Sequence, residues 1–255
     1  MSGTRRVVIT AGASGIGRAM AEAFLAAGDR VAVCDRDGAV LAGVVAAHPG
    51  LVGVEADITD EGAMAAFLDR IEAEWGGADV VCANAGMGGP AGFIEEIGLQ
   101  DWRDCLSVNL DGAFLTCRWA ARVMRAQGSG VILITSSVSG LSGFPQRSPY
   151  VAAKWGLIGL TKALASELGP AGVRVNAVCP GAVEGPRMDR VVAMEAEARG
   201  ARADAVREGF ADGAALRRLD RVEEVAGTAL FLASDAASAI RGQALAVDGH
   251  TERVT

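Results

Sequence analysis

The alternation of short apolar runs with longer amphipathic stretches, from the first residues to about residue 180, is the feature that most constrains the fold. This pattern is typical of repeated βα units, in which parallel strands are buried beneath helices. The chain has 255 residues, 51% of them hydrophobic, and no linker interrupts the alternation. We therefore expect an α/β fold in which residues 1–255 form a single doubly wound domain, with a parallel sheet of about seven strands and helices on both faces.

The apolar runs predict strands near residues 6–11, 30–34, 51–55, 79–83, 130–136, 173–178 and 243–247. The amphipathic stretches predict helices near residues 15–27, 37–47, 60–75, 100–126, 149–168 and 221–234. The segment at about 185–213 has helical spacing, no strand before or after it, and many Arg, Glu, Asp and Ala residues. Long connections are often functional, so we predict a substrate lid there; a solvated pair of surface helices is the alternative.

Composition and charge exclude several classes of protein. A net charge of −7 disfavours a nucleic-acid partner, which would need clustered Lys and Arg. No apolar run reaches the roughly 20 residues of a membrane helix, and the amino terminus lacks the features of a signal peptide, so we expect no membrane partner and a cytoplasmic protein. The five cysteines form no C-x-x-C pair, and neither of the two histidines has a Cys or carboxylate at metal spacing, which predicts reduced thiols and no metal site.

A glycine-rich turn, T-A-G-A-S-G-I-G, occupies residues 10–17, between the first predicted strand and the first predicted helix. Glycines allow the backbone to turn tightly and to approach a pyrophosphate, and the free N–H groups at the start of a helix favour anions. The turn therefore predicts a dinucleotide site on a Rossmann-type sheet. Its cofactor-binding residues would be Gly12, Ser14, Gly15, Ile16 and Gly17.

Asp35 follows the second predicted strand, 18 residues after Gly17. An acidic side chain at this place accepts hydrogen bonds from the adenosine ribose and would repel the 2′-phosphate of NADP. We therefore predict NAD as the cofactor and NADP as less favoured, although the adjacent Arg36 could also contact the cofactor and offer a partner to a phosphate. The alternative is that Asp35 and Asp37 only cap the next helix.

Tyr150 is the only tyrosine of the chain, and Lys154, one of only two lysines, follows it four residues later. Residues with this spacing share one face of a helix. An ammonium group beside a phenol favours the phenolate, and so lowers the phenol pKa from about 10 towards neutral pH. Tyr150 is therefore a candidate proton-transfer group. Most Y-x-x-x-K pairs are ordinary surface pairs, which is the alternative.

With these motifs in this order, the chain resembles the short-chain dehydrogenase/reductase family, in its short single-domain branch, over essentially its full length. The resemblance also rests on Asp57, on N-A-G at 84–86, on Asn109, on Ser137 thirteen residues before Tyr150, and on Pro180 and Gly181. It implies an oxidoreductase that interconverts a secondary alcohol and a ketone, with hydride transferred to or from a nicotinamide.

The resemblance implies a role for each matching residue. Tyr150 would be the acid and base, Ser137 the donor that polarises the substrate oxygen, and Lys154 both the group that lowers the pKa of Tyr150 and a ribose ligand. Asn109 would hold a water in a proton relay. The further cofactor contacts implied are Asp57, Ile58, Asn84, Ala85, Gly86, Pro180, Gly181 and Val183.

Plainer roles are open for some of these residues. Asn109 could simply break a helix, and Asn84 could simply serve a turn. The choice of Ser137 over Ser136 and Ser139 depends on its spacing from Tyr150.

The chain departs from the family pattern at two positions. Ala11 stands where T-G-x-x-x-G-x-G has its first glycine, and Gly185 stands where a threonine hydroxyl often touches the nicotinamide carboxamide. We expect cofactor binding to survive the first change, because Gly15 and Gly17 remain. The second leaves the orientation of the nicotinamide ring to backbone groups or to Pro186 and Arg187.

The substrate pocket is expected between the residues after Ser137, the loop 143–147, residues 88–93 and the lid over 186–210. Arg147 and Arg187 are candidate partners for a carboxylate or phosphate, with ordinary surface arginines as the alternative. We favour a small polar hydroxy compound as substrate. The alternatives are an NADPH-dependent 3-oxoacyl thioester reductase and a non-catalytic nucleotide-sensing or scaffold protein. The resemblance further implies a homotetramer, with residues 100–126, 149–168 and 244–247 at interfaces.

Overall fold

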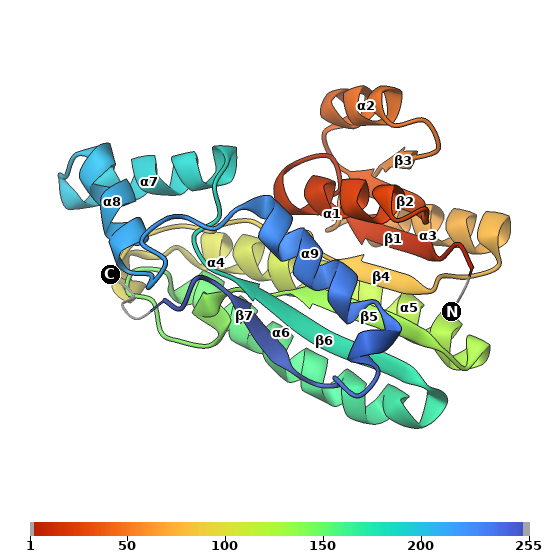
Figure 1. The fold of residues 1–255 in the computed structure, drawn as a ribbon. Helices are drawn as coiled ribbons and strands as arrows, with labels where there is room; N and C mark the ends of the chain where they lie inside the picture. Colours follow the sequence, from red (N-terminus) through yellow and green to blue (C-terminus); the bar gives the residue numbers. More distant parts are fainter. Residues whose placement is uncertain (1–2, 252–255) are drawn as a thin grey trace.

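A parallel sheet forms the centre of the protein, as the alternating apolar runs predict. The computed structural model describes residues 3–251, and within them seven strands pair in the order β3-β2-β1-β4-β5-β6-β7 (Figure 1). Every pairing is parallel, and β1 lies between β2 and β4. The strands are β1 (Arg6–Thr10), β2 (Arg30–Asp35), β3 (Val52–Glu55), β4 (Val80–Ala83), β5 (Gly130–Thr135), β6 (Val173–Pro180) and β7 (Ala244–Val247). The predicted fold class is confirmed.

Helices cover both faces of the sheet because right-handed βα crossovers run in opposite directions from β1 and from β4. On one face, α1 (Gly15–Ala26), α2 (Gly38–Ala47) and α9 (Val222–Leu232) bury residues such as Phe24 and Leu232 against the strands. On the other face lie α3 (Glu61–Trp75), α5 (Gly112–Gln127) and α6 (Ser148–Leu168), with Phe67 and Leu157 in that core. The sheet is therefore buried on both sides, which is why its strands read as continuous apolar runs.

The predicted helix over 100–126 is present as a continuous helical stretch, but a π-helical turn that the sequence did not reveal divides it into two α-helices. The first is α4 (Leu99–Leu106), the turn spans Ser107–Asp111, and α5 follows. Within the turn, the side-chain amide of Asn109 donates to the carbonyl of Cys105 at 2.9 Å and to that of Met87 at 3.0 Å. An amide side chain that bonds nearby backbone carbonyls competes with regular helical pairing. The amphipathic pattern continues through the turn and does not reveal it.

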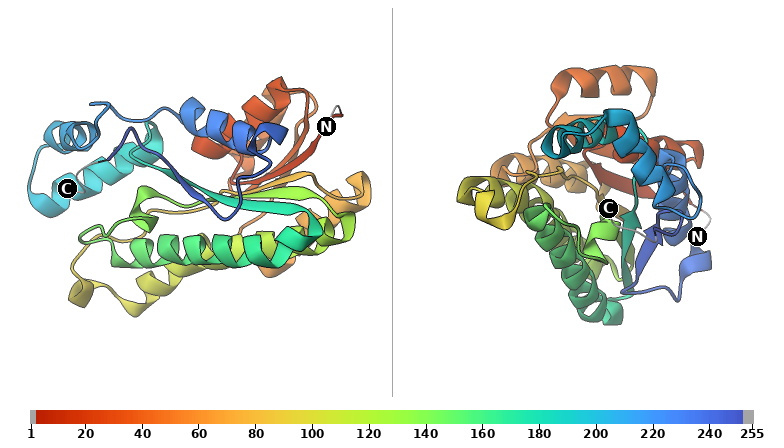
Figure 2. Two further views of the ribbon diagram at one scale, coloured as in Figure 1. Left: turned by 60° about the horizontal axis from the view of Figure 1, so that its bottom comes forward. Right: turned by 90° about the vertical axis from the view of Figure 1, so that its left-hand side faces the viewer.

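Two helices, α7 (Pro186–Arg199) and α8 (Ala203–Asp212), fill the segment predicted as a lid. They lie beyond the carboxyl ends of the strands, at one end of the molecule (Figures 1 and 2). Met188, Val192 and Val206 belong to a small apolar cluster of their own. The flanking chain is joined at the base, where Asp220 N donates to the carbonyl of Ala182 and Glu184 N donates to the carbonyl of Asp220, each at 2.8 Å. These two hydrogen bonds form an isolated β-bridge between Val183 and Asp220, which was not expected from the sequence.

Ala11 adopts a left-handed backbone conformation with φ 53°, which explains why a glycine is usual at this position. The left-handed region costs an L-residue roughly 1–2 kcal/mol, whereas the extra freedom of glycine in the unfolded chain costs up to about 1 kcal/mol. We therefore expect Ala11→Gly to raise the free energy of unfolding by about 0.5–1 kcal/mol. Urea denaturation measures the change.

The neighbouring Ala13→Gly is the matched control, because Ala13 is buried in the core between β2 and α1 and has no positive φ. It is expected to lower the free energy of unfolding. An Ala11→Gly protein no more stable than the parent would show that the strain at Ala11 is not felt by the folded state.

Candidate active site

Two neighbouring strands whose connections lead in opposite directions, β1 and β4, frame the site. The hydroxyl of Thr10 accepts from the backbone N–H groups of Asn84 and Ala85, each at 3.0 Å. The side-chain amide of Asn84 donates to the carbonyl of Thr10 at 3.1 Å, and its oxygen accepts from the hydroxyl of Thr135 at 3.1 Å. Asn84 therefore ties three strand ends together at the point where open α/β sheets bind their ligands.

The glycine-rich turn presents the start of α1 to this crevice. Ser14 is the N-cap residue, but its side chain accepts no capping hydrogen bond. Gly15 has φ 51°, and a Cβ atom there would meet nothing within 4 Å. A Cβ atom at Gly17 would collide with the backbone carbonyl of Ala11, so Gly17 serves the close packing of helix on turn. Open space beside uncapped helix N–H groups fits the pyrophosphate of a dinucleotide.

A cavity of about 560 Å³ runs from this turn to α7 and α8, a size typical of cofactor and substrate sites. The predicted site residues that line it are Ser14, Gly15, Ile16, Gly17, Asp35, Arg36, Asn84, Gly86, Ser137, Arg147, Tyr150, Lys154, Pro180, Gly181, Val183 and Arg187. The cavity lining does not include Gly12, Asp57, Ile58, Ala85 or Asn109. A Cβ atom at Gly12 would collide with Val33, so this glycine packs the turn against β2.

Asp35 and Asp37 have different structural roles. Asp37 is the N-cap of α2, and its carboxylate accepts from Val40 N at 3.0 Å. The carboxylate of Asp35 accepts from Ala13 N at 3.1 Å and from Asp37 N at 3.2 Å, which fixes it beside the glycine-rich turn at the cavity edge. The helix-cap alternative therefore holds for Asp37 and not for Asp35.

Tyr150 lies on the first turn of α6, surrounded by cationic groups. The ammonium of Lys154 is 5.5 Å from the centroid of the Tyr150 ring and donates to the carbonyl of Thr135 at 3.0 Å. Burial raises the pKa of Tyr150, but Lys154, Arg187, a hydrogen bond with Ser137 and Arg147 together lower it below its usual value. Burial lowers the pKa of Lys154, and Tyr150 opposes that change. The arrangement therefore favours the phenolate of Tyr150 more than water does for a free tyrosine side chain.

The three serines that follow β5 have different roles, as their hydrogen bonds show. Ser136 donates its hydroxyl to the carbonyl of Lys154 at 2.9 Å and thereby braces α6. The hydroxyl oxygen of Ser137 accepts from Ser139 N at 3.1 Å, which leaves its proton for a substrate oxygen or for Tyr150. Among these three, Ser137 is the one whose hydroxyl acts on the pKa of Tyr150.

Asn109 lies behind the cavity as a positioning residue. It is fully buried, and its side-chain oxygen accepts from Met87 N at 3.3 Å. A Cβ atom at Gly86 would stand 2.7 Å from that oxygen and 3.4 Å from the ammonium of Lys154. Gly86 is therefore a place where only glycine fits between Asn109 and Lys154.

Gly185, at the position where the resemblance implies a threonine, is the N-cap of α7 with φ 131°. A β-branched residue is strained in that conformation. The glycine is thus part of how this chain starts α7, and no side chain replaces the missing hydroxyl at this position.

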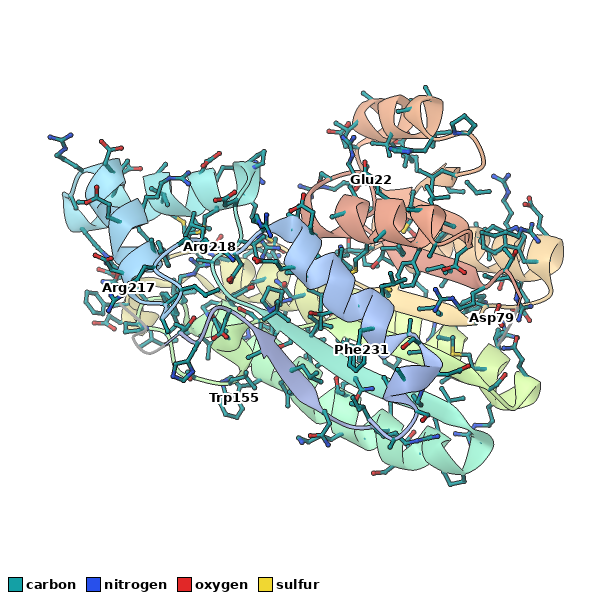
Figure 3. All side chains as sticks on the ribbon, viewed as in Figure 1. Glu22, Asp79, Trp155, Arg217, Arg218 and Phe231 are labelled. Atoms are coloured by element: carbon teal, nitrogen blue, oxygen red, sulfur yellow. The ribbon has the colours of Figure 1, made fainter. Side chains whose placement is uncertain are left out.

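Several cavity residues were not predicted from the sequence. Glu195 of α7 is buried near Arg147, and burial raises its pKa although Arg199 and Arg147 oppose the change. Asp220 stands at the bridge to Val183, where burial and the nearby Asp248 raise its pKa to about 6. Arg218 lies between the lid and the start of α9 (Figure 3). Nothing in the sequence pattern marks these residues, because their place in the cavity follows from how the segment 185–220 packs.

Two negative findings concern the described part of the chain. Within residues 3–251, no group of three or more His, Cys, Asp or Glu side chains could hold a metal ion. No helix in the same range combines the length and the apolar character needed to cross a membrane.

Comparisons with known proteins cover nearly the whole chain. A family model described as enoyl-(acyl carrier protein) reductase matches residues 10–250. The chain is 41% identical to a cis-4-hydroxycyclohexanecarboxylate dehydrogenase of Sinomonas cyclohexanicum, over 96% of this chain and 95% of that protein. It is 34% identical to a D-beta-hydroxybutyrate dehydrogenase of Rhizobium meliloti, over 96% and 98%. A crystal structure of an actinorhodin polyketide ketoreductase variant with NADPH superimposes with a TM-score of 0.94 at 28% identity, covering 98% of each chain.

Proposed function

Because this chain belongs to the short-chain dehydrogenase/reductase family, and is therefore an NAD(P)-dependent oxidoreductase acting on CH–OH groups, we propose that it is an NAD-dependent dehydrogenase of a small polar secondary alcohol. Family membership removes the non-catalytic alternative. The observation that carries the proposal is the meeting of Tyr150, Lys154 and Ser137 in the same cavity as the glycine-rich turn and Asp35.

The residues present fit a dinucleotide. The uncapped start of α1 with open space at Gly15 supports a pyrophosphate there, and the fixed carboxylate of Asp35 supports ribose hydroxyls without a 2′-phosphate. When bound, the nicotinamide takes or gives the hydride. Asp57 and Ile58 remain proposed adenine contacts, although neither lines the cavity.

The chain's own groups handle the proton. In oxidation, the phenolate of Tyr150 accepts the alcohol proton while the hydroxyl of Ser137 donates a hydrogen bond to the same oxygen. Lys154 stabilises the phenolate and is held in place by the carbonyl of Thr135 at 3.0 Å. Asn109 contributes through the water relay that the family resemblance implies.

The proposal extends to assembly and location. We propose a homotetramer, because large apolar side chains stand exposed on the helices expected at interfaces: Phe114 of α5 is 46% exposed and Trp155 of α6 is 49% exposed. A cytoplasmic location is part of the same proposal. Trp155 projects away from the body of the molecule (Figure 3). We also propose that residues 1–255 act as one domain whose segment 185–213 is the lid.

A substrate panel assayed with both cofactors tests the proposed function. The panel contains cis-4-hydroxycyclohexanecarboxylate, D-beta-hydroxybutyrate, D-threitol and large apolar alcohols, each with NAD and NADP. We expect oxidation of at least one small polar alcohol, with kcat/KM at least tenfold higher for NAD than for NADP. The second candidate, an NADPH-dependent 3-oxoacyl thioester reductase, is favoured by the likeness to the ketoreductase with NADPH. Preference for NADPH with acyl thioesters would replace the first proposal with the second.

A further inference from the structure

Three side-chain cations surround the ring of Tyr150. The side-chain cations of Arg147, Lys154 and Arg187 lie 5.3, 5.5 and 5.9 Å from the centroid of the Tyr150 ring. Lys154 is the cation that lowers the pKa of the phenol most, and its ammonium is held by the carbonyl of Thr135. The two arginines are therefore available for another task.

Arg187 is a cavity-lining guanidinium without a partner. It lies in the first turn of α7, and within residues 3–251 it has no hydrogen bond or ion pair, only its contact with the Tyr150 ring. A guanidinium offers five N–H donors in a planar fork that matches a carboxylate. The start of α7 adds its own partial positive charge in the same place.

Arg147 is buried with unused hydrogen-bonding capacity. It is 6% exposed, and one terminal nitrogen donates to the carbonyl of Gly88 at 2.7 Å, while its buried Nε atom has no partner in the described part of the chain. The carboxylate of Glu195 comes no closer than 3.9 Å, which is too long for a hydrogen bond, and it stands nearer to Arg199, at 3.0 Å. Arg147 therefore lines the cavity with only a long ion pair to Glu195 and with one buried donor unpaired.

Apolar side chains line part of this end of the cavity, beside charged residues such as Glu195 and Asp220. Phe144, on the loop before α6, and Phe210, on α8, stack with ring centroids 6.5 Å apart, and both line the cavity. Met188 and Val191 of α7 line it as well. A compact hydrocarbon skeleton would have these side chains as its contacts.

We infer that the substrate is a hydroxy carboxylate, with its hydroxyl at Tyr150 and Ser137, its carboxylate on Arg187 and Arg147, and its hydrocarbon skeleton against Phe144 and Phe210. The inference rests on the proposed function for the reaction. In oxidation, the C–H bond breaks with its electron pair going to NAD, the hydroxyl proton goes to the Tyr150 phenolate, and the C=O bond forms. The carboxylate takes no part in the chemistry and fixes the orientation of the reacting carbon.

Binding of a non-reactive acid tests the carboxylate site without relying on turnover. Cyclohexanecarboxylate and the neutral cyclohexanecarboxamide are titrated by calorimetry into the protein, with and without NADH. We expect the carboxylate to bind at least tenfold more tightly than the amide, and Arg187→Gln to remove that difference, because a charge-assisted bidentate contact is lost. Arg187 is solvent-exposed, so its replacement does not disturb the core.

Two further variants sharpen the result. Arg202→Gln, at an exposed arginine of the same lid, is the matched control and should bind both compounds like the parent. Glu195→Gln removes a like charge and should tighten carboxylate binding. If D-threitol binds in place of the acid and Glu195→Gln weakens it, Glu195 accepts polyol hydroxyls and the inference is wrong. The inference is also wrong if Arg187→Gln weakens the binding of NADH by the same factor as the binding of the acid, since Arg187 would then hold the cofactor.

Turnover separates the two levels of the proposal. The kcat/KM for cis-4-hydroxycyclohexanecarboxylate should exceed that for its methyl ester at least tenfold in the parent, and the two should become similar in Arg187→Gln. Equal rates for acid and ester in the parent would overturn the carboxylate inference alone. No oxidation of any alcohol, together with Arg187-dependent binding of cyclohexanecarboxylate, would overturn the proposed function and leave the anion site standing.

Discussion

Replacing Tyr150 with phenylalanine is expected to lower kcat for alcohol oxidation by about 10³-fold, because a positioned proton-transfer group contributes roughly 10²–10⁴-fold. The ring and its contacts with the three cations remain, so the dissociation constant of NADH should change less than twofold. Stopped-flow or steady-state turnover measures the first quantity and fluorescence titration the second. Turnover within tenfold of the parent would show that another group moves the proton.

The two lysines of the chain provide a matched pair for the same mechanism. Lys154→Met removes the buried ammonium beside Tyr150 and should also reduce turnover strongly. Lys162→Met replaces an exposed lysine whose ammonium donates a long hydrogen bond, 3.4 Å, to the carbonyl of Gly242. This variant should keep the turnover of the parent. Equal losses in the two variants would point to a general effect of removing charge from α6.

The pH dependence follows from the lowered pKa of Tyr150. Oxidation needs the phenolate, so its rate falls as pH drops through that pKa, whereas reduction needs the phenol and its rate falls as pH rises through it. Arg187 is one of the charges that lower this pKa. The oxidation profile of Arg187→Gln should therefore move to higher pH, and residual turnover of Tyr150→Phe should lack this limb.

The second large effect concerns the choice of cofactor. Asp35→Ser removes the carboxylate that would repel a 2′-phosphate and leaves Arg36 beside the vacated place. We expect kcat/KM to fall about tenfold with NAD and to rise about tenfold with NADP, because each change corresponds to roughly one charge-assisted hydrogen bond gained or lost. Initial rates with the two cofactors at saturating alcohol measure the ratio.

Asp37→Ser is the control for the Asp35 variant. Asp37 caps α2 through Val40 N, and serine is also a good N-cap residue, so both stability and cofactor ratio should stay close to those of the parent. An Asp35→Ser enzyme that keeps the parent's NAD to NADP ratio would mean that Asp35 only supports the glycine-rich turn through Ala13 N.

The sequence predicted the sheet well because each strand is buried on both faces and so is marked by its composition alone. Val31, Ala32 and Val33 of β2 are all fully buried, as a continuous apolar run predicts. Spacing along the chain was enough to single out Tyr150, Lys154 and Ser137. Their meeting in one cavity depends on the parallel register of β5 and β6, which the alternation of elements already implies.

The features that the sequence did not reveal depend on side-chain contacts between distant elements. The π-helical turn arises because Asn109 bonds the carbonyls of Cys105 and Met87, and hydrophobic periodicity does not report such bonds. Glu195 looks like an ordinary charged residue of an exposed helix until α7 packs over the cavity. Asp37 can be identified as the helix cap, and Asp35 cannot, only once the hydrogen-bond partners of both carboxylates are known.

The bridge between Val183 and Asp220 brings the two ends of a 36-residue segment, 184–219, to one point. Since the segment leaves and re-enters the body at neighbouring places, its length and sequence can change without altering the register of any strand. Within a lineage of such enzymes, selection can therefore revise the residues that recognise the substrate, Arg187 and Phe210 among them, while the apparatus that handles the proton and the nucleotide is inherited unchanged.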